Sequence, residues 1–313
     1  MLNETVLILA GITMLYYGGD ILVNGSIHIA QHFKISPFVI GATVIGFGTS
    51  LPELAVSVFA SIKGASAVAL GNAIGSNITN ICLVLGLTSL FGVMPISKKI
   101  FRTETPSFLF VTLLITTLAW DHEVSRSEGI FFLILMIGYL WLAFTKKKDE
   151  ERVDFQKNEL IKQSRIEFQI IRVVGGLSIL VLGAHLLVTG AVSIARSHGI
   201  SEWLIGITIV AVGTSLPEIV SSIIASFRGH HEMSIGNIYG SNIFNIILVV
   251  GVAATIHPLQ IKESIYIDLI VTTFLTFLLI LLIRPKLSLT PVHGVILLIC
   301  YFSYVGAKSL QIF

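Results

Sequence analysis

Charged side chains are scarce in this sequence of 313 residues. Asp, Glu, Lys and Arg make up 12% of it, against about 25% in a typical soluble domain. Hydrophobic residues make up 54%, and the mean hydropathy is +0.89. This composition argues against a soluble fold. The chain is predicted to be an integral membrane protein, with the lipid bilayer as a partner.

Cysteine is also rare, and several other signals are missing. Cys82 and Cys300 both lie in apolar stretches, so no disulfide framework or thiolate metal site is expected. Alternating ten-residue strands are absent, which excludes an outer-membrane barrel and leaves an all-α fold. There is no HExxH pair, and no second membrane aspartate is expected to partner Asp20, so an intramembrane protease is not predicted and the chain is not expected to be an enzyme.

Targeting and partner signals are equally sparse. The first segment has no basic leader and no small-residue cleavage site, so it is expected to remain as a helix. The net charge is only +2, and the basic residues are better explained as an orientation signal than by binding to nucleic acid. No cofactor, obligate protein partner or soluble calcium-sensing domain is indicated.

Apolar segments long enough to cross a bilayer are abundant. A spanning helix needs about 20 mainly apolar residues, and ten segments are predicted to cross. They lie at approximately 3–24, 35–62, 66–93, 104–120, 128–145, 169–191, 201–227, 232–256, 264–283 and 290–310. The segments at 104–120, 128–145, 264–283 and 290–310 carry few polar residues and are predicted to be a lipid-facing scaffold.

Lys and Arg orient these crossings. With the N-terminus outside, fifteen of them fall on the inner side and five on the outer side, which is the bias found in the loops of membrane proteins. The prediction is a multi-pass protein of the plasma or inner membrane with both termini outside. The loop at 146–168 is then cytoplasmic.

The chain contains an internal repeat. A shift of 165 residues aligns Gly18 to Gly86 with Gly183 to Gly251 without a gap, and 32 of 69 positions are identical. Five crossings per half make the second copy enter the membrane from the opposite side, as in the inverted repeats of many secondary transporters. The predicted units are a first repeat at 1–145, a linker at 146–168 and a second repeat at 169–313.

Glu53 stands near the centre of a predicted membrane helix, in the run Gly48 to Glu53, and the same six residues recur at Gly213 to Glu218. A charge at that depth costs about 2.5–3.5 kcal/mol on translocon scales and usually marks an ion path. The plainer alternative is a pair of glutamates neutralised by hydrogen bonds in a packed bundle.

Proline precedes each of these glutamates. Pro52 lacks an N–H and its ring clashes with the carbonyl four residues earlier, so the helix is predicted to open at Gly48 and Thr49. Pro217 is predicted to do the same at Gly213 and Thr214. Broken backbone at membrane depth is tolerated where it is buried or lines a cavity, so each break would offer carbonyl oxygens beside a glutamate.

Polar residues recur every four positions in the helix that follows each break, where they share one face. They are Asn72, Ser76 and Asn80 in the first copy and Asn237, Ser241 and Asn245 in the second. Gly71, Gly75, Gly236 and Gly240 lie near these polar faces and are predicted to allow close helix approach. The polar residues could simply tether helices. Aligned with the glutamates, they would complete an all-oxygen site, which suits Na⁺ and Ca²⁺ better than softer metals.

The two copies resemble the alpha repeats of the sodium/calcium exchanger family, within the cation/calcium exchanger superfamily, and the chain looks like a prokaryotic-type ten-helix member. The resemblance implies that Glu53 and Glu218 are the central Ca²⁺ ligands, joined by the backbone carbonyls of Thr49 and Thr214. It also implies Na⁺ sites and a middle position. The residues implied for these are Ser50, Ser76, Ser215, Ser241 and the carbonyls near Gly46 and Ala211 for Na⁺, with Asn80 and Asn245 lining the middle position.

The resemblance implies a secondary antiporter that exchanges Na⁺ for Ca²⁺, with three Na⁺ per Ca²⁺, extrusion of Ca²⁺, and the first and sixth helices sliding across a fixed core. Proton/calcium exchangers of the superfamily usually carry a glutamate shortly after the Gly-Asn of the third helix, where this chain has Ala73. Position 245 is Asn, where some microbial exchangers and the potassium-dependent relatives carry Asp. The missing charge argues against potassium dependence. The alternatives are a cation/proton antiporter and, less favoured, a cation channel.

Overall fold

The protein is almost entirely helical in a computed structural model that describes residues 2–145, 165–200, 205, 209, 211–261 and 263–310. The first half contains α1 (Leu2–Phe33), α2 (Pro37–Ile40), η1 (Gly41–Ile45), α3 (Gly46–Thr49), α4 (Leu51–Ile62), α5 (Ser66–Thr79), η2 (Asn80–Val84), α6 (Leu85–Leu90), β1 (Met94–Pro95), α7 (Lys98–Leu118), η3 (Ala119–Asp121), β2 (Glu123–Val124) and α8 (Arg126–Thr145). The second half contains α9 (Ile166–Ser197), α11 (Ala211–Thr214), α12 (Leu216–Phe227), α13 (His231–Phe244), η5 (Asn245–Val250), α14 (Gly251–Ile256), β3 (Leu259–Gln260), α15 (Glu263–Ile283), β4 (Ser288–Leu289) and α16 (Pro291–Ser309).

The repeat in the sequence is also a repeat in the structure. Adding 165 to the bounds of α4, α5 and α7 gives the bounds of α12, α13 and α15. The π-helical turns η1, η2 and η5 interrupt the helices that carry the polar positions, and η2 and η5 begin at repeat-related residues, Asn80 and Asn245. This recurrence supports two similar halves.

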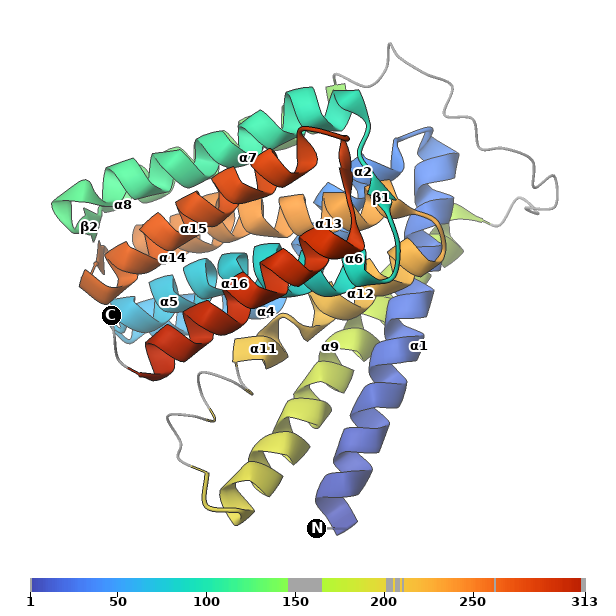
Figure 1. Ribbon diagram of the computed structural model, residues 1–313, viewed down its shortest axis with the longest axis horizontal. Coiled ribbons are helices and arrows are strands. Elements are labelled where there is room, and N and C mark those ends of the chain that lie inside the picture. Colours follow the sequence, from blue (N-terminus) through green and yellow to red (C-terminus); the bar gives the residue numbers. More distant parts are fainter. Residues whose placement is uncertain are drawn as a thin grey trace.

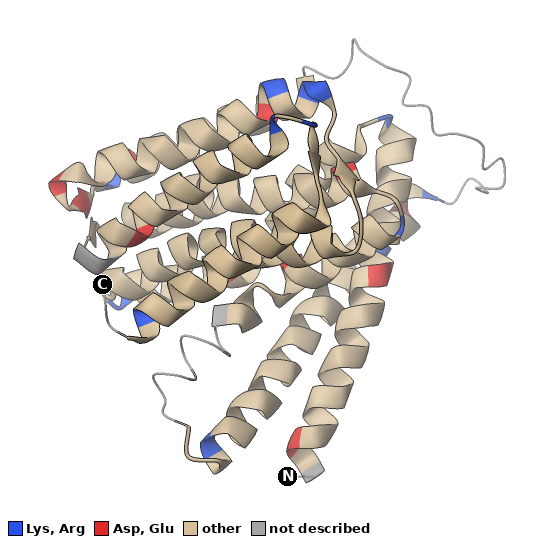
Figure 2. Cartoon of the chain, in the orientation of Figure 1, with Lys and Arg blue, Asp and Glu red and all other residues tan. Residues whose placement is uncertain are grey.

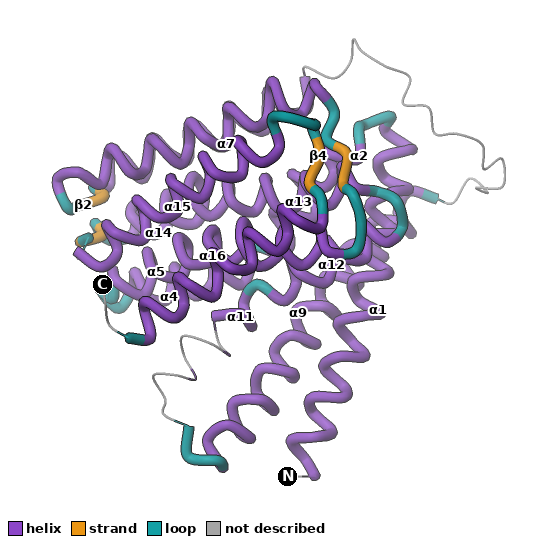
Figure 3. The backbone as a smooth tube through the Cα atoms, viewed as in Figure 1, coloured by secondary structure: helices purple, strands orange, loops and turns teal. Residues whose placement is uncertain are grey.

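Two short strand pairs tie the halves together. β1 pairs with β4 and β2 pairs with β3, both antiparallel. Met94 is opposite Leu289, and Val124 is opposite Leu259, so the 165-residue shift converts one pair into the other with its register kept. The pairs lie at opposite ends of the helical bundle (Figure 3).

The helices divide into an inner and an outer set. In the apolar window of the span Ser66–Leu90 78% of the residues are buried, and in that of His231–Ile256 83% are buried, against 17% in each of α8 and α16. Large apolar side chains such as Ile137 on α8 and Phe302 on α16 are exposed. Charged residues gather near helix ends, with long uncharged stretches between them (Figure 2). The outer helices are suited to face lipid.

Seven helices in the described ranges are long and apolar enough to cross a membrane, or eight if the bent pair formed by Pro37–Thr49 and Leu51–Ile62 is one span. The predicted crossing at 201–227 lies partly outside the described residues, and α12 alone is shorter. The other predicted crossing that is not among the eight corresponds to α7. This helix begins at Lys98, earlier than predicted, because the Ser97 hydroxyl caps it by accepting from Ile100 N.

The first and sixth helices are longer than predicted. The segments 3–24 and 169–191 were expected to span, but α1 and α9 each contain 32 residues, or about 48 Å. Most of the linker predicted at 146–168 lies outside the described residues, and α9 already begins at Ile166. The two helices lie side by side and extend away from the other helices (Figure 1). A Cβ on Gly18 would lie 2.6 Å from Leu180 N, so this pairing requires a residue without a side chain.

The helix breaks fall one residue later than predicted. α3 ends at Thr49, Ser50 is not helical (φ −84°, ψ 1°), and α4 begins at Leu51. The two parts of this span meet at a bend of 44°. Pro52 therefore sits in the first turn of α4, where its missing N–H needs no helical partner. Ser215 (φ −89°, ψ 5°) makes the same break between α11 and α12.

Close packing through glycine occurs in the second copy. A Cβ on Gly236 would lie 2.2 Å from Phe38 O, and one on Gly240 would lie 2.1 Å from Ala42 O. The backbone of α13 therefore touches the backbone of α2 and η1.

The first copy differs. Among the described residues no atom lies within 4 Å of a Cβ built on Gly71 or Gly75, and both glycines line a cavity. The prediction of close helix approach is confirmed for Gly236 and Gly240. For Gly71 and Gly75 it stays a prediction, because most of the repeat counterpart of α2 and η1, at 202–210, lies outside the described residues.

This difference predicts unequal effects of one substitution at repeat-related positions. Gly240→Val should destabilise the fold by about 3 kcal/mol or more, because the new side chain meets backbone that cannot move away. Gly75→Val should leave the melting temperature in detergent close to that of the wild type. A Gly240→Val protein that melts like the wild type would contradict the packing described here.

Candidate ion-binding site

Two glutamates lie at the centre of the inner helices. Glu53 is in the first turn of α4 and Glu218 in the first turn of α12, directly after the two breaks. Their relative exposures are 0% and 1%, and the two carboxyl groups interact electrostatically with each other. The fold thus brings together two acidic groups that are 165 residues apart in the chain.

The surroundings of Glu53 come mainly from α5. Ser76 Oγ donates to Glu53 Oε1 at 3.4 Å. Asn72 Nδ2 donates to the backbone oxygen of Glu53 and to Ser57 Oγ, both at 2.9 Å. Ser76 therefore contacts the carboxylate, whereas Asn72 holds α5 against α4.

The first break faces α13 of the other half. Ser241 Oγ donates to Gly46 O at 3.2 Å and lies 3.3 Å from Thr49 Oγ1. The hydroxyls of Thr49 and Ser241 also lie near the Glu218 carboxyl group. The Gly46 carbonyl predicted as a ligand is thus at the site, between the two copies.

Asn237 forms most of its hydrogen bonds within the second half of the chain. Its Nδ2 donates to Ser221 Oγ at 3.0 Å and to Ser222 Oγ at 2.9 Å, and its Oδ1 accepts from Thr49 Oγ1 at 3.3 Å. Asn237 and Asn72 are therefore equivalent tethers between the two inner helices of each half.

Several buried oxygens of this centre accept no direct hydrogen bond within the described part of the chain. They are Glu53 Oε2, both carboxyl oxygens of Glu218, Ser50 Oγ, Ser215 Oγ, Asn80 Oδ1 and Asn245 Oδ1. Buried polar atoms are nearly always paired, so oxygens left over in one place call for a partner. A hard cation is the partner that accepts carboxylate, hydroxyl and amide oxygens together.

Few of the potential oxygen ligands at this centre are charged. Among the residues that the structure describes, no group of three or more His, Cys, Asp or Glu could hold a metal. The centre therefore offers two carboxylates and otherwise neutral oxygens, which suits one divalent ion or a few monovalent ions.

Two asparagines that the sequence analysis left without a role join the halves. Asn77 Nδ2 donates to Asn242 O at 3.1 Å, and Asn245 Nδ2 donates to Asn77 Oδ1 at 3.1 Å. Both Asn77 and Asn242 are fully buried. The signal was present, because Asn77 and Asn242 are identical repeat-related positions, but the repeat does not tell which residue each contacts.

The remaining predicted site residues are placed less closely. Thr214 ends α11 and lines a cavity together with Ser76. Ala211 begins α11, and its side chain lies outside the described residues. Their predicted ligand roles stay predictions.

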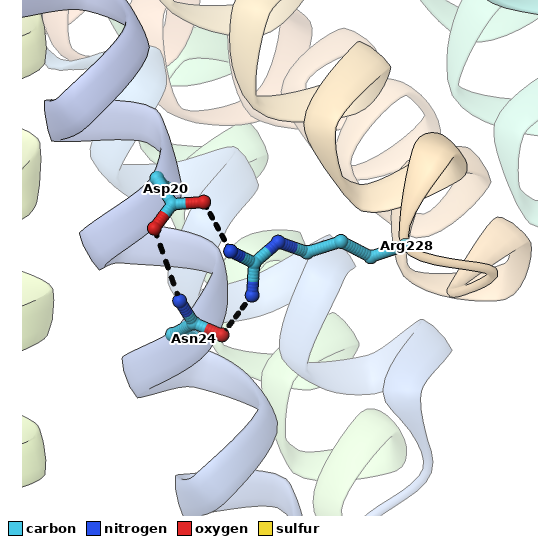
Figure 4. A network of polar contacts seen from close by, with 3 residues as sticks. All are labelled: Asp20, Asn24 and Arg228. Carbon is cyan, nitrogen blue, oxygen red and sulfur yellow. Dashed lines mark hydrogen bonds and ion pairs between the residues drawn. The ribbon is translucent and has the colours of Figure 1, made fainter.

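Asp20 and His231 contact partners other than the two glutamates. Asp20 and Asn24 of α1 both bind Arg228, which follows α12, and Asn24 Nδ2 donates to Asp20 Oδ2 (Figure 4). This ion pair joins α1 to the end of α12. His231 Nδ1 lies 3.0 Å from Ser226 Oγ, and the repeat-related counterpart of Asp20, His185, is exposed.

One membrane carboxylate has partners that the sequence does not predict. Asp268 lies inside α15, a helix predicted to be lipid-facing scaffold with few polar residues. Asp268 is 7% exposed; its Oδ1 lies 2.9 Å from Lys308 Nζ and accepts from Tyr304 at 3.0 Å. Both partners are on α16, about 40 residues away in the chain, which local sequence patterns do not connect.

Comparison with known proteins agrees with this geometry. A family model described as sodium/calcium exchanger protein matches residues 3–145 and 168–310. The sodium/calcium exchanger MaX1 of Methanosarcina acetivorans is 30% identical over 339 residues, covering 96% of this chain and 97% of the relative. The inner membrane protein YrbG of Escherichia coli is 35% identical, covering 85% and 84%.

A solved structure of the sodium-calcium exchanger NCX_Mj, soaked with 10 mM Na⁺ and zero Ca²⁺, is similar along the whole chain. Its TM-score is 0.87 at 33% sequence identity, with 98% of this chain and 99% of that chain covered. The family model and these relatives span both repeats and the helices that carry the two buried glutamates. The chain belongs to the sodium/calcium exchanger protein family.

Proposed function

We propose that this protein is a secondary antiporter that exchanges Na⁺ for Ca²⁺ across the membrane by alternating access. The observation that carries the proposal is the set of buried oxygens without donors around Glu53 and Glu218. Membership of the sodium/calcium exchanger family and the likeness to MaX1 and NCX_Mj support it.

The two glutamates are proposed as the central Ca²⁺ ligands. Two carboxylates balance one Ca²⁺, and without a cation they would repel each other in an apolar surrounding. The Thr49 and Thr214 carbonyls are proposed to join them. The same oxygens accept Na⁺, so the two ions compete for one charge pair, and this competition is what couples their opposite movements.

The Na⁺ positions are proposed at the neutral oxygens around this pair. They are Ser50, Ser76, Ser215, Ser241 and the carbonyls near Gly46 and Ala211, with Asn80 and Asn245 lining the middle. Three Na⁺ per Ca²⁺ would move one net charge per cycle, worth about 2.3 kcal/mol per 100 mV. Extrusion of Ca²⁺ driven by Na⁺ is the proposed direction.

The membrane arrangement is proposed to follow the repeat. We propose ten crossings in two inverted five-helix units, at 1–145 and 169–313, with both termini outside and the loop at 146–168 in the cytoplasm. The recurrence of helix bounds at 165 residues supports the repeat. The strand pairs at opposite ends of the bundle support its inversion.

A proton-coupled antiporter is the second candidate. In α5, Ala73 directly follows Gly71 and Asn72, and the helix contains no acidic residue. This favours Na⁺ over protons as the coupling ion, because proton/calcium exchangers usually carry a glutamate at this point of the third helix.

The central experiment is transport into sealed vesicles. Ca²⁺ uptake should require an opposing Na⁺ gradient and should rise when the membrane potential favours the net charge of a 3:1 exchange. Uptake driven equally well by a proton gradient without Na⁺ would overturn the sodium assignment. Uptake that stops at equilibrium in every gradient would instead indicate a channel.

Direct binding tests the glutamates. Glu53→Gln and Glu218→Gln should each weaken Ca²⁺ binding by at least about 100-fold, since a buried charge facing a divalent ion contributes several kcal/mol. Isothermal titration on purified protein measures this. Glu104→Gln, on α7, is the control and should bind normally; tight binding by both site variants would remove the proposed ligands.

The contact between α1 and Arg228 tests movement of the helix pair. If α1 and α9 slide against the other helices during transport, the ion pair of Arg228 with Asp20 has to break. Arg228→Gln and Asp20→Asn should then each raise turnover at saturating ions by about two- to fivefold, because a part-exposed ion pair contributes up to about 1 kcal/mol.

The double variant of Arg228 and Asp20 distinguishes this from unrelated effects. It should show no further increase, because both substitutions remove one interaction. Ca²⁺ binding should stay unchanged in all three proteins. Additive effects, or turnover unchanged in both single variants, would show that the contact does not limit the cycle.

A further inference from the structure

A cavity of about 570 Å³ lies between α5 and α16. Ala67 in the first turn of α5 and Lys308 in the last turn of α16 both line it. Ser76, which also lines it, is nine residues further along α5, or about 14 Å. The cavity therefore extends from the end of the bundle that carries Lys308 towards the middle of the inner helices.

Its inner end reaches the candidate ion site. Ser76 and Asn72 line the cavity, and these two side chains donate to the carboxylate and the backbone oxygen of Glu53. Among the described residues, no helix separates this end of the cavity from the oxygens around Glu53.

The outer end carries a positive charge, which is unexpected on a route for cations. Lys308 belongs to the lining, and its side chain is 22% exposed. An ammonium group repels Ca²⁺ twice as strongly as Na⁺ at the same distance. In a cavity with mainly apolar walls this repulsion is screened less than in water.

Asp268, on the neighbouring helix α15, forms an ion pair with Lys308 and so offsets its positive charge. It reaches Lys308 from α15 with an Nζ to Oδ1 distance of 2.9 Å, and its own side chain is 10% exposed. Tyr304, another lining residue, donates to the same carboxyl oxygen at 3.0 Å. The carboxylate is thus held by two α16 side chains that face the cavity.

We propose that Asp268 is a positioning residue for ion entry: it holds and neutralises Lys308 at the mouth of the cavity and so sets how readily Ca²⁺ enters relative to Na⁺. This inference rests on the proposed function. The same pair could also serve only as a structural link between α15 and α16. Loss of a structural link would change Na⁺ and Ca²⁺ affinities by similar factors, whereas loss of charge neutralisation would change the Ca²⁺ affinity more.

The test uses exchange kinetics of the full-length protein in vesicles, with ions added to one face at a time. Asp268→Asn adds one positive charge at the mouth, whatever else Lys308 contacts. A local potential changes the concentration of an ion by a factor that is squared when its charge doubles. A loss of about threefold in apparent Na⁺ affinity should accompany a loss of about ninefold for Ca²⁺.

Lys308→Gln should do the opposite and raise the apparent Ca²⁺ affinity more than the Na⁺ affinity. The double variant restores the charge sum, so its affinities should return close to those of the wild type. All shifts should shrink in high choline chloride, which screens the potential, and should appear only for ions added to the face on which the cavity opens. If Asp268→Asn does not fold, Lys308→Gln alone carries the test.

The inference would be overturned if Asp268→Asn changed the apparent affinities for Na⁺ and Ca²⁺ by equal factors. It would also be overturned if the double variant had lower affinities than either single variant. The pair would then be only a structural link between α15 and α16. Wild-type exchange in the same vesicles separates this result from the proposed function. If the wild type exchanges no ions, the proposed function itself is overturned. If it exchanges and the shifts follow ion charge, both stand.

Discussion

The structure depends on one electrostatic constraint, two carboxylates facing each other in the least polar part of the molecule. Glu53 and Glu218 are almost completely buried, and hydrogen bonds from the described residues satisfy one of their four carboxyl oxygens. The helix breaks, the hydroxyls beside them and the asparagine contacts between the halves all surround this pair. A bundle built for stability alone would gain nothing from leaving these oxygens without partners.

The rest of the fold keeps that centre rigid while leaving it accessible. In the second half α13 packs backbone to backbone against α2 and η1, and the bonds among Asn77, Asn242 and Asn245 lock the halves together. In the first half the matching surface of α5 lines a cavity instead. Rigid ligands and an open approach are both needed for a site that must bind ions selectively and still exchange them.

Much of this arrangement could be predicted from the sequence because it is encoded locally and twice. A buried glutamate after a proline identified the breaks, and the 165-residue repeat paired Glu53 with Glu218. What could not be predicted depends on contacts between distant residues: Asp268 with Lys308, Asp20 with Arg228, and Asn77 with Asn245. Nor could identical glycines be told apart, since Gly75 and Gly240 differ only in what the fold places against them.

That difference between Gly75 and Gly240 has a consequence for the energy landscape of the protein. Within the described part of the chain, these repeat-related glycines have different surroundings: Gly240 meets the backbone of η1, whereas no described atom lies within 4 Å of a Cβ on Gly75. A second conformer with these roles exchanged would use the same kinds of contacts, so its free energy differs only through the residues that are not repeated. For the proposed inverted repeat, duplication of the halves would give two states of similar energy, and unrepeated residues such as Asp20 and Asp268 would adjust their balance.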